Sequence, residues 1–342
     1  MSEIITVGLD LAKNVFQVHG ADASGRAVLR KKLRRDQVLA FVGQLPPCVV
    51  AMEACSGAHF WGREIGKLGH DVRLIPPAYV KPFVKRQKND AADAEAICEA
   101  ALRPTMRFVP VKSEEAQGAA TVFRVRELLI RQRTQAINAL RGHLAEFGHI
   151  VPQGAANAAR LIAIVEDPDS GLPLDAATTL KVLVAALTRL EGEIGKLDAE
   201  IARQAKENDA ARRLMTVPGI GPLIATAIAV LAPPPETFRR ARDFAAWLGL
   251  TPRQHSTGGK QRLGATTKMG ERSLRRLLIL GANSVIIKRR VHAAARPGSW
   301  LAQMLTRKPP MLVRVALANK MARIVWALMA RGGVYHSPAT AS

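Results

Sequence analysis

Short apolar blocks follow one another through the first hundred residues, and they predict one mixed sheet. An apolar run over 3–11 predicts a strand that ends at Val7-Gly8-Leu9-Asp10, and the alternation over 14–20 predicts its hairpin partner. A third short strand follows near 27–33. The blocks beyond it predict, in order, a helix over 36–45, a strand over 48–52, a helix over 58–68, a strand over 72–75 and a helix over 90–102. Three strands in a meander followed by β–α–β units predict an α/β fold.

Helical periodicity dominates the middle of the chain. Apolar residues predict one long helix over 114–147. Farther on, apolar residues recur at spacings of three and four, as in a heptad repeat. They are Leu180, Leu183, Leu187, Leu190, Ile194, Leu197 and Ile201. This repeat predicts a coiled coil through which subunits associate. The alternative is a core helix that packs on its own domain, since three heptads are the lower limit for a coiled coil.

The last third begins with a Gly-x-Gly turn between two apolar segments. Gly219 and Gly221 lie between a helix that ends near Leu214 and the apolar run over 223–231. A helix, a Gly-x-Gly hairpin and a second helix are typical of helix-hairpin-helix proteins, whose hairpin amides bind a DNA phosphate. A tight turn inside a core is the alternative. Further helices are predicted over 238–250, 274–287 and 311–329, so this part is mainly helical.

The charge of the chain indicates what kind of partner it binds. The composition, with 48% hydrophobic and 23% charged residues, is that of a folded protein. The net charge of +22 indicates a polyanionic partner. The charge is concentrated in 237–342, where twenty Lys and Arg stand against two acids, Asp243 and Glu271. Nucleic acid is therefore the expected partner, and a merely solvated basic surface is the alternative.

Two other classes of protein are disfavoured. The segment 214–235 carries no charge, but its prolines leave too short a helix to span a bilayer. No signal-peptide pattern precedes the first strand. Cys48, Cys55 and Cys98 are odd in number and lack the spacing of metal ligands, which favours reduced thiols. We expect a cytoplasmic protein without a membrane partner.

Four acidic residues occupy related positions in the predicted sheet. Asp10 ends the first strand, Glu53 ends the fourth, and Asp90 and Asp93 share one face of a helix. If the two strands are neighbours, their carboxylates emerge at the same sheet edge. Carboxylates that converge repel each other unless cations lie between them, and oxygen ligands favour Mg²⁺ or Mn²⁺. Taken singly, each acid would be an ordinary surface charge, but together they predict a metal site.

A polar loop in the last third predicts a phosphate-binding site. Ser256 lies at its edge, and Gly258 and Gly259 free backbone amides that could face a phosphate diester. Cationic side chains follow in the loop and in the helix after it. They are Lys260, Arg262, Lys268, Arg272, Arg275 and Arg276. We expect this segment to bind the nucleic-acid backbone.

The motifs around these residues resemble those of a known family. Asp10 lies in Gly-Leu-Asp-Leu-Ala-Lys, Glu53 in Met-Glu-Ala-Cys-Ser-Gly, and Asp90 and Asp93 in Lys-Asn-Asp-Ala-Ala-Asp-Ala. They look like the four acids of the DEDD transposases of bacterial insertion sequences, in the IS one-ten family. The loop Arg-Gln-His-Ser-Thr-Gly-Gly-Lys is closest to the eleven-eleven branch of that family. The resemblance covers almost the whole chain.

The resemblance implies three domains and a reaction. It implies a RuvC-like domain of ribonuclease H fold over 1–150, a helical coiled-coil connector over 151–208, and a transposase domain over 209–342. It also implies recombination of element-end and target DNA through a phosphoserine, directed by a noncoding bridge RNA, in a dimer or tetramer. The family's serine corresponds to Ser256. Thr257 is a second hydroxyl beside it, and the choice between the two stays open.

Two other functions compete with this expectation. A metal-dependent endonuclease of the junction-resolvase type would use the acids and water, and would leave the Ser-Thr-Gly-Gly segment unexplained. A non-catalytic nucleic-acid-binding protein would rely on the helix-hairpin-helix and would not need the acids. Both alternatives ignore half of the motifs, so the sequence favours a recombinase.

Overall fold

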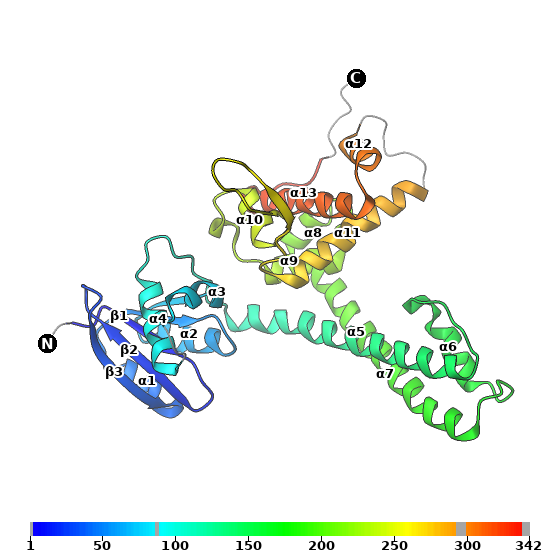
Figure 1. Cartoon of the computed structure of the whole chain (residues 1–342), viewed down its shortest axis with the longest axis horizontal. Helices are drawn as coiled ribbons and strands as arrows, with labels where there is room; N and C mark the ends of the chain where they lie inside the picture. The colour runs from blue at the N-terminus through cyan, green and yellow to red at the C-terminus, as the bar shows by residue number, and fades with distance from the viewer. Residues whose placement is uncertain (1–2, 86–88, 292–298, 337–342) are drawn as a thin grey trace. The chain divides into compact units, whose positions relative to one another are not determined.

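The computed structural model describes residues 3–85, 89–291 and 299–336, and the chain divides into two compact units, Met1–Gln117 and Gly118–Ser342 (Figure 1). We call them the first and the second unit. The long helix α5 (Glu114–Glu146) belongs to the second unit from Gly118 on. The reason is that α5 contributes its apolar residues to the cores of the second unit.

The first unit is built on a five-stranded mixed sheet of order β3-β2-β1-β4-β5. Its strands are β1 (Thr6–Asp10), β2 (Val15–Ala21), β3 (Ala27–Arg34), β4 (Val49–Glu53) and β5 (Asp71–Ile75). The first three strands are antiparallel, and β4 and β5 run parallel to β1. The predicted α/β fold and the expected neighbourhood of the first and fourth strands are confirmed.

Helices cover both faces of this sheet. On one face, α1 (Val38–Val42) and α2 (Ala58–Lys67) bury Val38 and Trp61 against Phe16 of β2. On the other face, α4 (Asp90–Ala101) packs Ile97 against Ala51 of β4. The short α3 (Pro77–Val80) follows β5. The predicted helix over 36–45 is shorter than expected, because a 3-10 turn over Arg35–Gln37 precedes it and Gly43 caps it.

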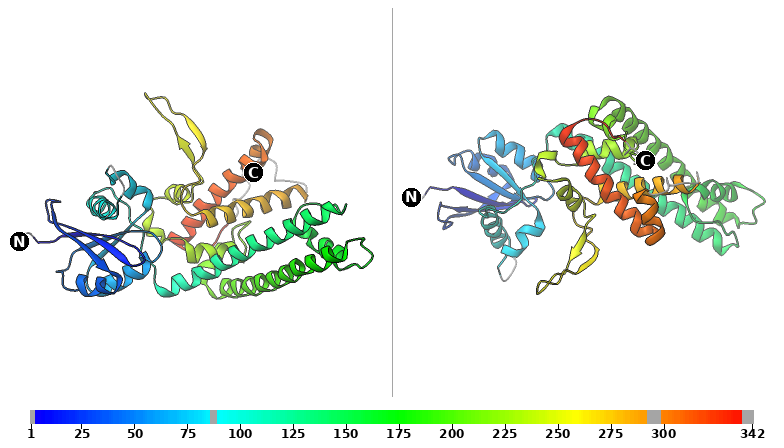
Figure 2. Two further views of the ribbon diagram at one scale, coloured as in Figure 1. Left: turned by 60° about the horizontal axis from the view of Figure 1, so that its bottom comes forward. Right: turned by 90° about the horizontal axis from the view of Figure 1, so that it is seen from above.

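The second unit begins with two long helices that pack along each other (Figure 2). They are α5 and α7 (Leu174–Glu207), with the shorter α6 (Ala158–Glu166) between them in the chain. Leu140 and Leu144 of α5 share one core with Leu180 and Leu187 of α7. The heptad seam is thus buried in part within its own chain, which agrees with the alternative of a core helix that packs on its own domain. Leu183, Leu190 and Leu197 of the same repeat are only half-buried, so the association of subunits through α7 stays a prediction.

The rest of the second unit is a helical bundle with a small β-hairpin. The bundle comprises α8 (Asp209–Leu214), α9 (Pro222–Leu231), α10 (Ala241–Trp247), α11 (Arg272–Val291), α12 (Trp300–Arg307) and α13 (Pro310–Arg331). Strands β6 (Pro252–Gln254) and β7 (Leu263–Thr266) form the hairpin, which projects from the helices of its unit (yellow in Figure 2). Of the helix predicted over 238–250, only the seven residues of α10 are helical in the structure. Within the described residues, no helix has the length and apolar character that crossing a membrane requires.

Candidate active site

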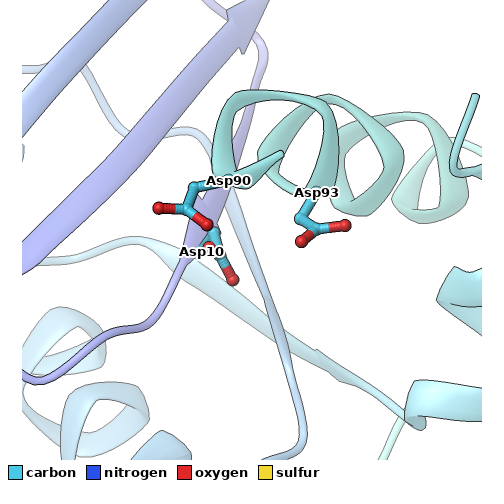
Figure 3. Close-up of side chains that lie close together, drawn as sticks. All are labelled: Asp10, Asp90 and Asp93. Atoms are coloured by element: carbon cyan, nitrogen blue, oxygen red, sulfur yellow. The ribbon is translucent and has the colours of Figure 1, made fainter. Parts of the chain in front are cut away.

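Three of the four predicted acids come together at one edge of the first unit's sheet (Figure 3). Asp10 ends β1, and Asp90 and Asp93 lie in the first turn of α4. Each of the three offers a carboxylate oxygen that lies within 4.8 Å of the oxygens of the other two. Asp10 and Asp93 are half-buried and Asp90 is exposed, so the cluster opens to solvent on one side. Sequence positions far apart in the chain thus form one acidic site.

A glycine in β1, Gly8, explains how α4 can pack so closely on this strand. A Cβ added at Gly8 would lie 2.2 Å from the carbonyl oxygen of Ala94 and 2.7 Å from the amide nitrogen of Cys98. No other residue could occupy this position without displacing the helix. Asp10 is two residues beyond Gly8 and therefore on the same face of the strand, and Asp93 directly precedes Ala94. Gly8 is a residue of the site that the sequence analysis missed, although a glycine inside a strand was a usable signal.

Glu53 lies beside this cluster but not in its closest group. β1 and β4 are parallel with Leu9 opposite Met52, so Asp10 and Glu53 are the next pair along the two strands. Gly8 and Ala51 are paired and face α4, hence Asp10 and Glu53 face it too. Burial raises the pKa of the Cys55 thiol, and the charges of Glu53 and Asp10 raise it further. Both carboxylates therefore act on the same thiol at this edge.

The donor set fits a hard divalent cation. The close group consists of carboxylate oxygens, with neither His nor Cys in it. Such ligands suit Mg²⁺ and Mn²⁺. The N-terminus of α4, capped by Asn89 through the Ala92 amide at 2.9 Å, adds a favourable dipole for Asp90 and Asp93. A cation bound among the three carboxylates would reduce their mutual repulsion further.

The predicted phosphate-binding loop is the tip of the hairpin in the second unit. Thr257 and Lys260 exchange backbone hydrogen bonds, and Gly258 and Gly259 between them have φ angles of 55° and 76°. A two-residue hairpin turn of this kind needs two positive φ angles, which explains both glycines. Ser256 directly precedes the turn and is exposed. The hairpin therefore presents the candidate nucleophile near its tip.

A cavity of about 590 Å³ lies along one side of the hairpin. His255, Thr257, Lys260 and Arg262 line it, together with Leu263 and Gly264, and Ser256 is outside this lining. A Cβ added at Gly264 would lie 2.9 Å from the His255 ring, so the imidazole packs directly over the glycine. Thr257 and Ser256 are thus two hydroxyls in different surroundings. The cavity carries two cations, as expected of a surface that holds a phosphate.

The three arginines in the first two turns of α11 have different surroundings. Arg275 donates hydrogen bonds to the carbonyl oxygens of Leu248 at 3.0 Å and Met269 at 2.9 Å, which ties together the two chain segments at the base of the hairpin. Burial lowers the pKa of Arg275. Arg276 forms an ion pair with Glu127 of α5 at 3.6 Å, and Arg272 is exposed. Arg275 therefore holds the base of the hairpin together, and its predicted binding to the nucleic-acid backbone stays a prediction.

The base of the hairpin is held by unusual backbone geometry as well. Lys268 has a φ of 55°, which is uncommon for a residue other than glycine, and its amide donates to the carbonyl oxygen of Gly249. A Cβ added at Gly270 would lie 1.8 Å from the carbonyl oxygen of Trp247. These contacts fix where the hairpin leaves the bundle. A Lys at position 268 is thus part of a constrained turn and also carries a charge.

The two glycines of the helix-hairpin-helix pattern also differ. Gly219 has a φ of 87°, and a Cβ added there would lie 2.6 Å from the carbonyl oxygen of Gly281 in α11. A Cβ added at Gly221 would meet no atom of the described residues within 4 Å, and Gly221 directly precedes α9. Gly219 is therefore explained by the close packing of the turn on α11. Gly221 and the N-terminus of α9 are the part of the pattern with space for a phosphate.

Comparison with known proteins gives one consistent result over the whole chain. A family model described as transposase of the IS116/IS110/IS902 family matches residues 211–296, and a transposase model for the DEDD proteins of IS110 matches residues 7–149. A probable family 20 transposase of Pseudomonas aeruginosa is 50% identical over 96% of this chain and 98% of its own length. The transposase for insertion sequence element IS1328 of Yersinia enterocolitica is 41% identical over 98% of this chain and 99% of its own length. The transposase for insertion sequence element IS1111A of Coxiella burnetii is 36% identical over 98% of this chain and 92% of its own length.

Proposed function

Because this chain belongs to the IS116/IS110/IS902 family of insertion-sequence transposases, in its IS1111 branch, we propose that it cuts and rejoins DNA strands through a phosphoserine link. The observation that carries the proposal is the convergence of three carboxylates, from Asp10, Asp90 and Asp93, within 4.8 Å. Three carboxylates this close together repel one another, and a cation bound between them would offset that repulsion. A site that binds a cation and a phosphate diester gives them a purpose, and a RuvC-like reading of the first unit agrees with it.

In this proposal the acids hold Mg²⁺ or Mn²⁺ at the end of β1. Asp10, Asp90 and Asp93 are the ligands of the close group, and Glu53 on the neighbouring strand is the fourth acid. When bound, the cation supplies Lewis-acid stabilisation of the charge that develops on the phosphate oxygens. The half-buried positions of Asp10 and Asp93 keep their carboxylates in place, while the exposed Asp90 leaves room for the DNA strand.

The covalent step belongs to the hairpin. The Ser256 hydroxyl gives up its proton as its oxygen bonds to phosphorus, and the bond between phosphorus and the 3′ oxygen breaks. The 3′ oxygen takes up a proton, which leaves a 5′-phosphoserine and a free 3′-hydroxyl. Attack by the 3′-hydroxyl of another strand then forms a new phosphodiester and restores the serine. Because the link conserves the phosphodiester, rejoining needs no ATP.

Ser256 is preferred over Thr257 on steric grounds. A primary hydroxyl is less crowded than a secondary one, and the backbone of Thr257 is tied to Lys260 by two hydrogen bonds. Ser256 is exposed directly before the turn, outside the pair of backbone hydrogen bonds that closes it. Thr257 remains the rival nucleophile, since it lines the hairpin cavity together with His255.

Backbone binding is assigned to the cations and amides that the structure leaves accessible. Lys260 and Arg262 line the hairpin cavity, and Arg272 is exposed at the start of α11. Gly258 and Gly259 form the hairpin tip, and Gly221 precedes α9. These groups would neutralise and orient phosphates of element-end and target DNA. Arg275 and Gly219 would support them from inside the bundle.

A noncoding bridge RNA and a homo-oligomer complete the proposal. Both rest on the family resemblance, and the net charge of +22 is compatible with binding two kinds of nucleic acid. The proposed dimer or tetramer would need surfaces other than the buried positions of the α7 heptad seam, which pack against the chain's own α5 and α6.

A labelled DNA duplex with an element end tests the covalent step. After denaturation in detergent, the wild-type protein should carry the labelled strand as an adduct, and Ser256→Ala should carry none while it still binds the duplex. Thr257→Ala serves as the matched control and should keep the adduct. An adduct that survives in Ser256→Ala and disappears in Thr257→Ala would assign the nucleophile to Thr257. Cut strands with free 5′-phosphates and no adduct would favour a water-dependent nuclease.

A further inference from the structure

We propose that a second cavity in the first unit binds an unpaired base of the DNA strand that the acid cluster holds. The cavity has a volume of about 600 Å³ and is lined by Asn14, Val15, Arg34, Arg35, Phe60 and Trp61, among others. This inference rests on the proposed strand-cutting function, and it adds a site to it. None of these residues belongs to the acid cluster or to the hairpin of the second unit.

The cavity lies at the same end of the sheet as the acids. β1 ends at Asp10, and Asn14 lies in the turn that leads from there into β2. Val15 pairs with Arg34 where β3 ends, and the Arg35 amide donates to the Asn14 carbonyl oxygen at 2.9 Å. Phe60 and Trp61 are in the first turn of α2, a few residues after Glu53. The cavity and the acids therefore lie at the same end of the sheet. The cavity is on the face that α2 covers, and the acids are on the face that α4 covers.

An exposed aromatic ring forms one wall of the cavity. Phe60 is 42% exposed, whereas its neighbour Trp61 is only 4% exposed. The Phe60 ring contacts the Trp61 ring edge-on, with centroids 5.4 Å apart, and Trp61 in turn contacts the buried Phe16 at 5.0 Å. An exposed ring beside cationic groups offers a face on which a base can stack. The core thus supports Phe60 as a stacking platform that is open on one side.

Cationic groups complete the wall. The Arg35 guanidinium lies over the Trp61 ring, 5.1 Å from its centroid, and remains exposed. Arg34 is exposed and pairs with Asp36 at 3.4 Å, a contact that solvent screens. Exposed Lys31 and Lys32 of β3 precede these arginines in the chain. An aromatic face beside guanidinium groups is the combination that holds a stacked base and its flanking phosphate.

The chemistry favours an unpaired base over a duplex. A paired base is stacked between its neighbours and cannot offer a face to Phe60, whereas a base near a cut site can leave the stack. The position at the same end of the sheet as the acids favours DNA, which is the strand that the acids are proposed to hold. The site would keep that strand from re-pairing while the cut end is transferred.

Photocrosslinking tests the inference without any strand cutting. A short single-stranded DNA with 5-iododeoxyuridine at one position is bound to the full chain without divalent metal, irradiated, and the attached peptide identified by mass spectrometry. We expect attachment to Phe60. We also expect Phe60→Ala to bind the oligonucleotide about 10-fold more weakly, which is the scale of one base–aromatic stack. Phe60→Leu, which keeps apolar volume, should lose affinity to a similar extent.

Phe147 provides the matched control, because it is also a phenylalanine with 42% of its surface exposed. Phe147→Ala should bind the oligonucleotide as the wild type does. Wild-type affinity in both Phe60 variants, or attachment only at other residues, would overturn the inference and leave the strand-cutting proposal standing. Attachment of an iodouridine RNA with none of the DNA would overturn the assignment to DNA. Attachment at Phe60 in a protein that cuts no strand with Mg²⁺ would support this cavity and contradict the proposed function alone.

Discussion

Gly8 and the carbonyl oxygen of Ala94 face each other so closely that a methyl group at position 8 would lie 2.2 Å from that oxygen. This contact sets α4 directly on β1. Asp93 adjoins Ala94 in the chain, and Asp10 follows Gly8 by two residues on the same face of the strand. A single missing side chain thus determines whether the three carboxylates can meet.

Gly8→Ala should separate the acids. The backbone of Ala94 cannot yield as a flexible side chain would, so α4 must shift, at a cost of about 1–3 kcal/mol in the free energy of unfolding. We expect a lower melting temperature and Mn²⁺ affinity reduced at least several-fold, measured by calorimetry. Gly66→Ala is the control, since an added Cβ there meets no atom within 4 Å in the exposed part of α2. That variant should be as stable as the wild type or more stable. Equal Mn²⁺ affinity in Gly8→Ala would contradict the structural role given to Gly8.

Arg272 and Arg275, at the start of α11, should behave differently. Arg275→Lys loses the paired hydrogen bonds to Leu248 and Met269, so its free energy of unfolding should fall by about 1–3 kcal/mol. Arg272→Gln removes an exposed cation. It should leave the melting temperature unchanged and lower the slope of log affinity for DNA against log salt by about one. Chemical denaturation and salt-dependent binding check the two effects. Unchanged stability in Arg275→Lys together with a weaker salt dependence of DNA affinity would assign Arg275 to the DNA-binding surface.

The heptad residues of α7 should act within one chain. Leu187 is fully buried against the core that α5 and α6 share with α7. Leu187→Ala should therefore lower the free energy of unfolding by about 2–5 kcal/mol, without changing the mass of the assembly in light scattering. Val182, which is 68% exposed on the same helix, is the control, and Val182→Ala should change neither quantity measurably. A smaller assembly for folded Leu187→Ala would show that the seam joins subunits.

The sequence could predict the first unit better than the second for physical reasons. Strands buried on both faces, such as β1 and β4, are continuous apolar blocks that end at their turns, so Asp10 and Glu53 could be placed at strand ends. A heptad repeat, by contrast, specifies an apolar stripe without saying which helix covers it. The partner of Leu187 was therefore a matter of tertiary structure.

The candidate site shows the same division. The spacing of Asp90 and Asp93 places both on one helix face, and this much was predictable. The closeness of Asp10 to them depends on the absent side chain of Gly8, and the role of Arg275 depends on carbonyl oxygens more than five residues away. The hairpin tip had a signal in Gly258-Gly259, but polar flanking residues hid the strands, because an exposed ribbon needs no apolar alternation.

His19 should make the first unit sensitive to acid. It lies opposite Gly8 on β2, and burial lowers its pKa, while Glu95 raises it and Arg30 and Lys85 lower it. Below a pH of about 6.5, this histidine is protonated more readily in the unfolded chain than in the native state. The free energy of unfolding should therefore fall as the pH drops below that value. His19→Gln should reduce this dependence in melting curves between neutral and mildly acid pH. His143→Gln, at an exposed position of α5, should not. An unchanged slope in His19→Gln would contradict this assignment.

Sulfur substitution at the scissile phosphate tests most directly whether the acid cluster holds the metal that acts on DNA. A non-bridging oxygen at the cut position is replaced by sulfur, and cleavage of the element end is measured in Mg²⁺ and in Mn²⁺, which accepts sulfur more readily. We predict that one of the two phosphorothioate isomers is cut poorly in Mg²⁺ and is restored in Mn²⁺. We predict further that Asp93→Asn abolishes cutting in both ions. Equal sulfur effects in the two ions for both isomers, or undiminished cutting by Asp93→Asn, would contradict the metal site proposed at Asp10, Asp90 and Asp93.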